Sequence, residues 1–219
     1  MNRVIELRQY TLKPGRRDDL IALFERQFVE SQEAEGMRVI GIFRDANDPD
    51  RFVWLRGFAD MESRARSLAA FYSGPVWKAH RNAANDTMID SDNVLLLKPA
   101  WDGADFPKPG PRAPLGASRS AKGIVLASIH YFDAPVPDAF LVAFRALPDP
   151  HRIAAYVTEG SENTFPALPV RAGENVFVTF SLFADNNNRS SALPHELAKQ
   201  VKATETLRLI PTARSSLHA

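Results

Sequence analysis

The same order of strand-forming and helix-forming segments occurs twice along this chain of 219 residues. In the first half, apolar β-rich runs predict four strands, at residues 4–11, 39–44, 52–58 and 94–97. A helical period after Arg16 predicts one helix between the first two strands, and Asp60 and Pro75 are residue types that begin helices. This repeat restricts the fold more than any other feature, because both copies must bury similar apolar faces.

The second half repeats this order from Val125 onward, in an alignment that sets Tyr131 on Tyr10. Its hairpin connection, at about residues 159–173, is longer than the corresponding connection of the first half. Residues 102–123 are rich in proline and glycine and predict a linker rather than a packed element. We therefore expect a first domain at residues 1–101, a linker at 102–123 and a shorter second domain at 124–219. Asn186-Asn187-Asn188 predicts an exposed loop tip.

Each half is predicted to be a ferredoxin-like βαββαβ unit, with helices on one face of a four-stranded antiparallel sheet. The other face is apolar and must be covered, and the nearest cover is the other half of the same chain. We therefore predict an α+β fold in which two tandem units pack their sheets as a dimeric α/β barrel, an intrachain pseudo-dimer. The sequence leaves open whether such chains also assemble into a homo-oligomer.

Composition excludes several function classes. Lys and Arg number 27 against 26 acidic residues, so the chain lacks the basic excess that holds a nucleic-acid backbone. It has no cysteine, which excludes disulfides and thiolate metal sites and suits a reducing compartment. The charged N-terminal residues do not look like a signal peptide, and no apolar run reaches the ~18 residues of a membrane span. We expect a cytoplasmic protein with no membrane span and no nucleic-acid partner.

Three stretches carry a resemblance to a known family. Residues 7–15 (LRQYTLKPG), residues 54–64 together with Trp77, and residues 207–215 (LRLIPTARS) resemble the corresponding stretches of NIPSNAP proteins. The resemblance covers most of the chain and is best in the first half. It implies the dimeric α/β-barrel fold, no cofactor and no particular reaction.

Strand alternation sorts the side chains that could bind a ligand. We expect the aliphatic faces of the strands to meet the helices, which would place Glu6, Arg8, Tyr10, Trp54 and Arg56 toward the barrel interior. There they could hold an anionic or carbonyl-bearing ligand between aromatic walls. The alternative is that Glu6 forms a structural ion pair with Arg8 or Arg56.

A second candidate site lies between the first sheet and its helices, where Phe24, Phe28, Tyr72 and Trp77 could line a cavity. His80 follows Trp77 on the same helical face and is the best candidate for a general acid or base, with Glu6 as the other. The alternative for His80 is a helical histidine that only packs beside Trp77.

Two functions fit these features. The first is a module that binds an apolar or aromatic small molecule, or a partner protein, without chemistry. The second is a cofactor-independent enzyme, similar to a monooxygenase or an isomerase, that acts on an aromatic or carbonyl-rich substrate. No nucleotide-binding motif and no metal-ligand spacing occurs in the sequence.

Overall fold

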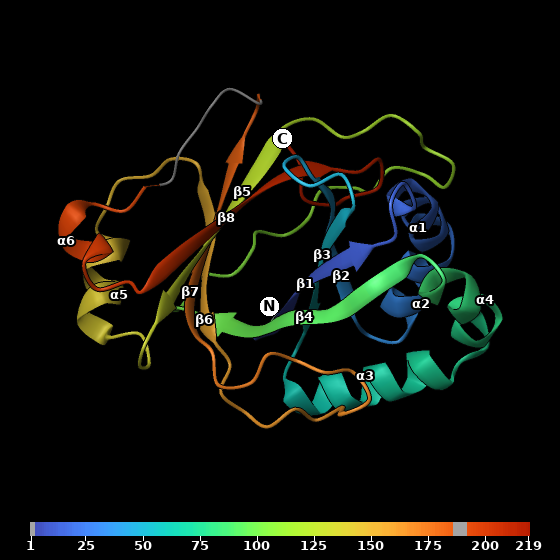
Figure 1. Cartoon of the computed structure of the whole chain (residues 1–219), viewed down its shortest axis with the longest axis horizontal. Coiled ribbons are helices and arrows are strands. Elements are labelled where there is room, and N and C mark those ends of the chain that lie inside the picture. The colour runs from blue at the N-terminus through green and yellow to red at the C-terminus, as the bar shows by residue number, and fades with distance from the viewer. Residues whose placement is uncertain (1–2, 186–191) are drawn as a thin grey trace.

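The computed structural model describes residues 3–185 and 192–219, and within them one closed antiparallel barrel of eight strands forms the centre (Figure 1). Around the barrel the strands follow the order β1-β3-β2-β8-β5-β7-β6-β4, and β4 pairs again with β1. The strands are β1 (Val4–Leu12), β2 (Arg38–Asp45), β3 (Arg51–Phe58), β4 (Met88–Pro99), β5 (Ile124–Phe132), β6 (Arg152–Thr158), β7 (Asn175–Phe183) and β8 (Ala203–Pro211). The predicted loop tip at Asn186–Asn188 lies outside the described residues.

The barrel has two sets of four adjacent strands. Half one, residues 3–101, contributes β4-β1-β3-β2, and half two, which begins at residue 124, contributes β8-β5-β7-β6. Their edges join along two seams, β2 with β8 and β4 with β6. The strands of one chain therefore pair edge to edge around a single closed ring, which leaves no free sheet edge among them.

The helices lie outside the barrel, on opposite sides for the two halves (Figure 1). Half one carries one long helical stretch and two further helices, which are α1 (Arg17–Leu23), η1 (Phe24–Phe28), α2 (Val29–Ala34), α3 (Met61–Ser73) and α4 (Pro75–Asn85). Half two carries α5 (Asp138–Arg145) and the short α6 (His195–Ala198). Asp60 caps α3 as predicted, because its carboxylate accepts a hydrogen bond from the Ser63 amide at 2.7 Å.

The interior of the barrel is filled by aliphatic side chains from both halves, such as Leu7, Leu55 and Ile129, all fully buried in one cluster. The opposite faces of β1 and β3 carry Tyr10 and Trp54, which pack with the helices of half one. The expected orientation of the two faces was therefore wrong. An eight-stranded barrel is just wide enough for side chains to fill it, and branched aliphatic residues fit there better than indole or guanidinium groups.

The pairing register shifts the alignment of β5 on β1 by one residue relative to the alignment made from the sequence. Tyr10 pairs with Phe52 in half one, and His130 pairs with Phe177 at the same place in half two. His130, not Tyr131, is therefore the counterpart of Tyr10. A shift of one residue moves every side chain of a strand to the other face, so the alignment by eye had reversed the faces of β5.

Two segments outside the strands also enter the core. Phe106 is only 4% exposed and belongs to the cluster inside the barrel, so the start of residues 102–123 is packed, which the proline-rich composition did not predict. Its backbone amide donates to the Tyr156 hydroxyl at 3.0 Å. Leu217, near the C-terminus, packs in the same cluster. Within the described residues, no helix is both long enough and apolar enough to span a membrane.

Candidate functional site

The most unusual feature of the molecule is a cluster of charged side chains buried between the barrel and the helices of half one. The Glu6 carboxylate on β1 accepts from Arg8 Nη1 and Arg56 Nε through one oxygen, each at 2.7 Å. Its other oxygen accepts from Arg64 Nε of α3, also at 2.7 Å. All four side chains are at most 1% exposed. The structural ion pair expected for Glu6 is present, but it involves three arginines and lies outside the barrel interior.

Burial by itself raises the pKa of the Glu6 carboxyl, because a charged group loses its water. The positive charges of Arg56, Arg8 and Arg64 outweigh this effect and hold the pKa of Glu6 far below its usual range. The carboxylate therefore stays ionised over the whole physiological pH range and is a very weak base.

Each of the three arginines also donates a hydrogen bond to a neutral side chain. Arg8 Nε donates to the Tyr10 hydroxyl at 2.9 Å, and Arg56 Nη1 donates to Gln32 Oε1 at 3.1 Å. Arg64 Nη1 donates to Asn163 Oδ1 at 2.9 Å. Burial raises the pKa of the Tyr10 phenol, with the charge of Arg8 opposing, so the phenol is neutral at neutral pH and keeps its proton for donation.

An aromatic cavity lies directly beside this cluster. Its volume is about 30 Å³, which is room for one or two water molecules. It is lined by residues of β1, β3, the start of β4 and the helical layer, which are Tyr10, Leu20, Phe24, Phe28, Gln32, Trp54, Phe71, Tyr72, Trp77, Ala84 and Met88. Tyr72 and Trp77 are half-buried, so they form the side of the cavity that is nearest to solvent.

The helix over the cavity is locally distorted. Residues Phe24–Phe28 form a π-helical turn between α1 and α2, and both of its phenylalanines line the cavity. Gln32 bridges the turn and the charge cluster, because its amide donates to the Phe28 carbonyl at 2.9 Å and its oxygen accepts from Arg56. π-helical turns are rare and occur frequently at functional sites.

The cavity also holds a buried donor without a partner. Trp54 Nε1 has no hydrogen-bond partner within the described residues. The guanidinium carbons of Arg56 and Arg8 lie 5.0 and 5.6 Å from the centre of the Trp54 ring. A ring that lines the cavity therefore carries an unpaired N–H group and lies close to two guanidinium groups.

The structure brings the predicted ligand-binding residues together, although on the other side of the sheet. Arg8 and Arg56 belong to the charge cluster with Glu6, while the adjacent cavity is lined by Tyr10, Trp54, Tyr72 and Trp77. His80 does not line it. The His80 ring is half-exposed and packs against Phe28 with ring centres 6.4 Å apart, and among the described residues it has no hydrogen-bond partner.

Sequence reasoning missed Arg64 and the connection between β6 and β7. Arg64 lies on the buried face of α3 with Leu68 and Phe71, at the spacing that marks one side of a helix. The β6–β7 connection of half two runs along α3 (Figure 1) and stacks Phe165 on Tyr72 with ring centres 5.8 Å apart. The unusual length of this connection was visible in the sequence, but its place over half one was not.

At the equivalent strand positions that the structure describes, half two has no such charge cluster. The strand register sets Leu126 where Glu6 stands and Ser181 where Arg56 stands. His130, in the place of Tyr10, shares a hydrogen bond of 2.9 Å with the Thr204 hydroxyl. The two halves therefore differ most where half one concentrates its charge.

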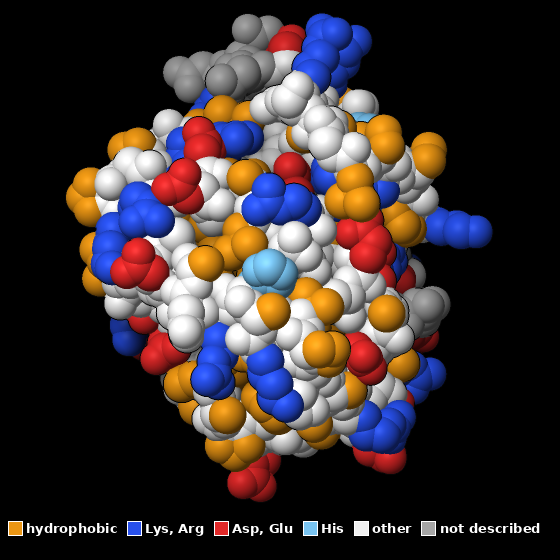
Figure 2. Space-filling model, turned by 90° about the vertical axis from the view of Figure 1, so that its right-hand side faces the viewer, with side chains coloured by type: hydrophobic (Ala, Val, Ile, Leu, Met, Phe, Trp, Pro, Cys, Tyr) orange, Lys and Arg blue, Asp and Glu red, His pale blue; other side chains and the backbone are white. Residues whose placement is uncertain are grey.

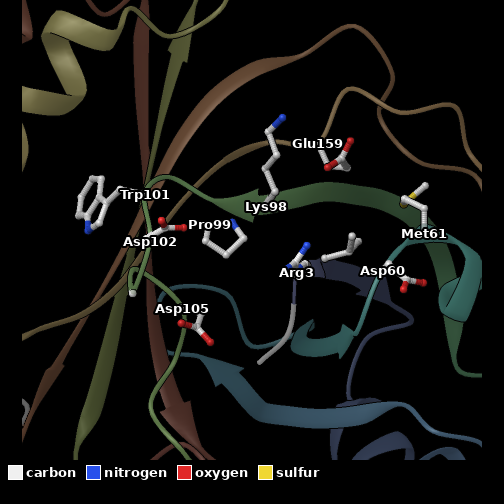
Figure 3. A pocket seen from close by; sticks show the side chains of 11 residues that line it. Arg3, Asp60, Met61, Lys98, Pro99, Trp101, Asp102, Asp105 and Glu159 are labelled. Carbon is white, nitrogen blue, oxygen red and sulfur yellow. The ribbon is translucent and has the colours of Figure 1, made fainter.

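A larger hollow on the surface has the character of an open groove. It measures about 520 Å³ and lies between the end of β4 and the start of α3. Figure 3 shows its acidic side chains spread along the rim, with Asp60 and Glu159 well apart from Asp102 and Asp105. Among the described residues, no group of three or more His, Asp or Glu side chains is placed to hold a metal ion. The face shown in Figure 2 mixes basic, acidic and apolar side chains without one large patch.

Comparisons with known proteins agree with this architecture. The barrel resembles a candidate monooxygenase from Lactobacillus acidophilus NCFM, with a TM-score of 0.55, 15% identity and coverage of 99% of this chain and 98% of that one. It also resembles a candidate monooxygenase from Fusobacterium nucleatum subsp. nucleatum, with a TM-score of 0.56, 8% identity and coverage of 99% and 96%. At these identities the likeness concerns the fold alone, a closed eight-stranded antiparallel barrel with helices outside it.

A family model matches the first half of the chain. Residues 5–102, slightly less than half of the chain, match the NIPSNAP family model. An uncharacterized NIPSNAP-like domain protein from Burkholderia xenovorans is 27% identical over 48% of this chain and 90% of its own, with a TM-score of 0.43. No curated protein matches the chain.

Proposed function

We propose that the protein binds a small planar aromatic molecule in the cavity under the helices of half one. The observation that carries the proposal is the unpaired Trp54 Nε1 in an aromatic cavity, because a buried donor without an acceptor is costly and marks a place for a ligand atom. The walls from Phe24, Phe28 and Trp77 would stack on the ligand ring. Trp54 and the Tyr10 hydroxyl would donate to its oxygen.

The size of the cavity sets a condition on binding. At about 30 Å³ it is smaller than a benzene ring, so a ligand enters only when its walls move. Tyr72 and Trp77 are two of its half-buried lining residues, with ring centres 4.8 Å apart, and in this proposal they move aside to admit the ligand. The π-helical turn supplies the adaptable wall, since its hydrogen bonds are already irregular.

The arrangement favours binding over the alternative of a cofactor-independent enzyme. Such an enzyme needs a base within reach of the substrate. Glu6 is held ionised by three arginines, and His80 is not among the residues that line the cavity. In this proposal the second half closes the barrel and covers the site. The interior of the barrel is packed with side chains and offers no space for a ligand.

The two halves share the strand order of a ferredoxin-like unit, which supports our interpretation of tandem units at residues 1–101 and 124–219 joined through 102–123. The chain contains no cysteine, which suits work in a reducing compartment such as the cytoplasm. A partner protein as the ligand, or a homo-oligomer, would be the competing explanation for a site that binds no small molecule.

The test is ligand-observed 19F NMR with 4-fluorobenzamide, a single aromatic ring that carries an oxygen acceptor. We expect its signal to broaden with the wild-type protein. Ala84→Leu fills the cavity, because Ala84 is fully buried in its wall, and should abolish the broadening. Ala79→Leu is the matched control, since Ala79 lies on the same helix and is exposed. Equal broadening with both variants would place the binding elsewhere and refute the proposal.

A further inference from the structure

The buried cluster contains more positive than negative charge. Arg8, Arg56 and Arg64 are each at most 1% exposed, and Glu6 is the carboxylate that they share. The other side chains that accept hydrogen bonds from them are neutral, namely Tyr10, Gln32, Met37, Asn163 and Thr164. Within the described residues, three cations therefore face one anion. An excess of buried positive charge is unfavourable, so the binding of a second anion at this cluster would be stabilising.

Free donors mark the place of that anion. Arg56 Nη2 and Arg64 Nη2 are both buried and have no hydrogen-bond partner among the described residues. Both guanidinium groups already bond the Glu6 carboxylate through Nε, so their unused nitrogens belong to one side-chain cluster. A carboxylate or similar oxyanion accepts from two such nitrogens at once, which a neutral oxygen does less well.

The free donors lie beside the aromatic cavity. The Arg56 guanidinium carbon is 5.0 Å from the centre of the Trp54 ring and 6.0 Å from that of Tyr72, and both rings line the cavity. A ring held in the cavity would therefore place a short charged substituent against Arg56.

Half two covers this charged end. Arg64 Nη1 donates to Asn163 Oδ1 at 2.9 Å and to Thr164 Oγ1 at 3.3 Å, and Phe165 of the same connection stacks on Tyr72. Asn163 also holds the shape of the connection, because its amide donates to the Leu168 carbonyl at 2.9 Å. The β6–β7 connection thus fastens to Arg64 and to the rim of the cavity at the same time.

We infer that the ligand of half one is an aromatic organic anion, with its ring in the cavity and its charged group on Arg56 and Arg64 beneath the β6–β7 connection of half two. The inference rests on the proposed function and adds the charge class of the ligand. It also gives half two a part in the site, as the cover over the charged group.

The experiment compares two probes of the same shape on the wild-type protein. 4-Fluorobenzoate carries a negative charge at neutral pH, and 4-fluorobenzamide is its neutral counterpart. We expect the benzoate to bind at least about tenfold more tightly, since charge-assisted hydrogen bonds are roughly twice as strong as neutral ones. Equal affinities would overturn the inference and leave the proposed function standing. Binding of neither probe would overturn both.

A variant then assigns the preference to the cluster. Arg64→Gln removes one free donor, so the benzoate should lose most of its advantage while the affinity for the benzamide stays the same. Arg66→Gln is the matched control on the same helix, because Arg66 is exposed and pairs with Glu62. An unchanged preference in folded Arg64→Gln would contradict the assignment. If Arg64→Gln does not fold, the comparison on the wild-type protein still decides.

Discussion

Replacement of the central carboxylate is the sharpest test of how the charge cluster is held. Glu6→Gln keeps the shape of the side chain but leaves three buried guanidinium groups without a counter-charge. Removal of one partner from a buried ion pair costs about 3–5 kcal/mol. Glu6 makes three such contacts at 2.7 Å, so we expect the upper part of that range. For a chain of this length, that loss lowers the melting temperature by roughly 10–20 °C.

The assay is thermal and urea unfolding followed by circular dichroism at neutral pH. Glu62→Gln is the control, because Glu62 also pairs with an arginine but is 84% exposed, and its change should not be measurable. A loss for Glu6→Gln of less than about 1 kcal/mol, against the ~3–5 kcal/mol expected for a broken buried pair, would refute the reasoning. It would mean that the arginines are solvated or that another anion neutralises them.

The pH dependence of the free energy of unfolding provides a second, independent test of the role of Glu6. The pKa of Glu6 is lower in the folded protein than in the unfolded chain, where it is about 4.3. Its contribution to stability is therefore present above pH ~4.3 and is lost as the pH falls below that value toward the folded pKa. Glu6→Gln should lack this part of the acid sensitivity. Identical acid unfolding curves for the wild type and the variant would contradict the assignment.

Three further predictions concern the rest of the barrel. Burial lowers the pKa of His130 to about 4, so stability should fall by roughly 3 kcal/mol as the pH drops from ~6.5 to ~4, and His130→Asn should remove this slope in urea unfolding. Leu217→Ala should cost about 2–4 kcal/mol in the same assay, because Leu217 packs inside the barrel; a change near zero would mean that the C-terminal residues are not part of the core. Gly41→Ala would bring a Cβ within 2.4 Å of the Phe43 ring and should lower the melting temperature, whereas Gly110→Ala, with no neighbour within 4 Å, should not.

The sequence was sufficient for the order of elements, because apolar period, caps and turn residues are local signals. It predicted the α3 cap at Asp60 and the strands within a few residues, although β4 begins at Met88, earlier than the predicted 94. The π-helical turn at Phe24–Phe28 had no local signal, since its residues suit an ordinary helix. Irregular turns of this kind depend on tertiary packing.

The sequence predicted several residues of the site but not the side of the sheet on which they lie. Alternation showed that Glu6, Arg8 and Arg56 share a face, but not which layer that face meets, because both layers of a barrel are buried. The deciding fact is the width of the barrel, which is a property of the closed sheet and not of any one strand. Arg64 was missed because an arginine on a helix is normally expected to face solvent. Its position on the buried face of α3 is explained only by its partner Glu6, which lies far away in the sequence.

The two seams of the barrel have a consequence for how the molecule opens. The β2–β8 seam consists of three residue pairs, from Phe43–Pro211 to Asp45–Leu209, and β4–β6 has three as well. Each seam contains a proline, Pro211 in β2–β8 and Pro99 in β4–β6, and proline has no N–H to donate to the ladder. Local opening of the barrel should therefore begin at the two seams, while the longer strand pairings within each half stay intact. Amide hydrogens at Asp45 and Val157 should then exchange with solvent before those in the middle of β1 or β5. A chain opened in this way exposes two complementary edges, and a second opened chain could close them by exchanging halves.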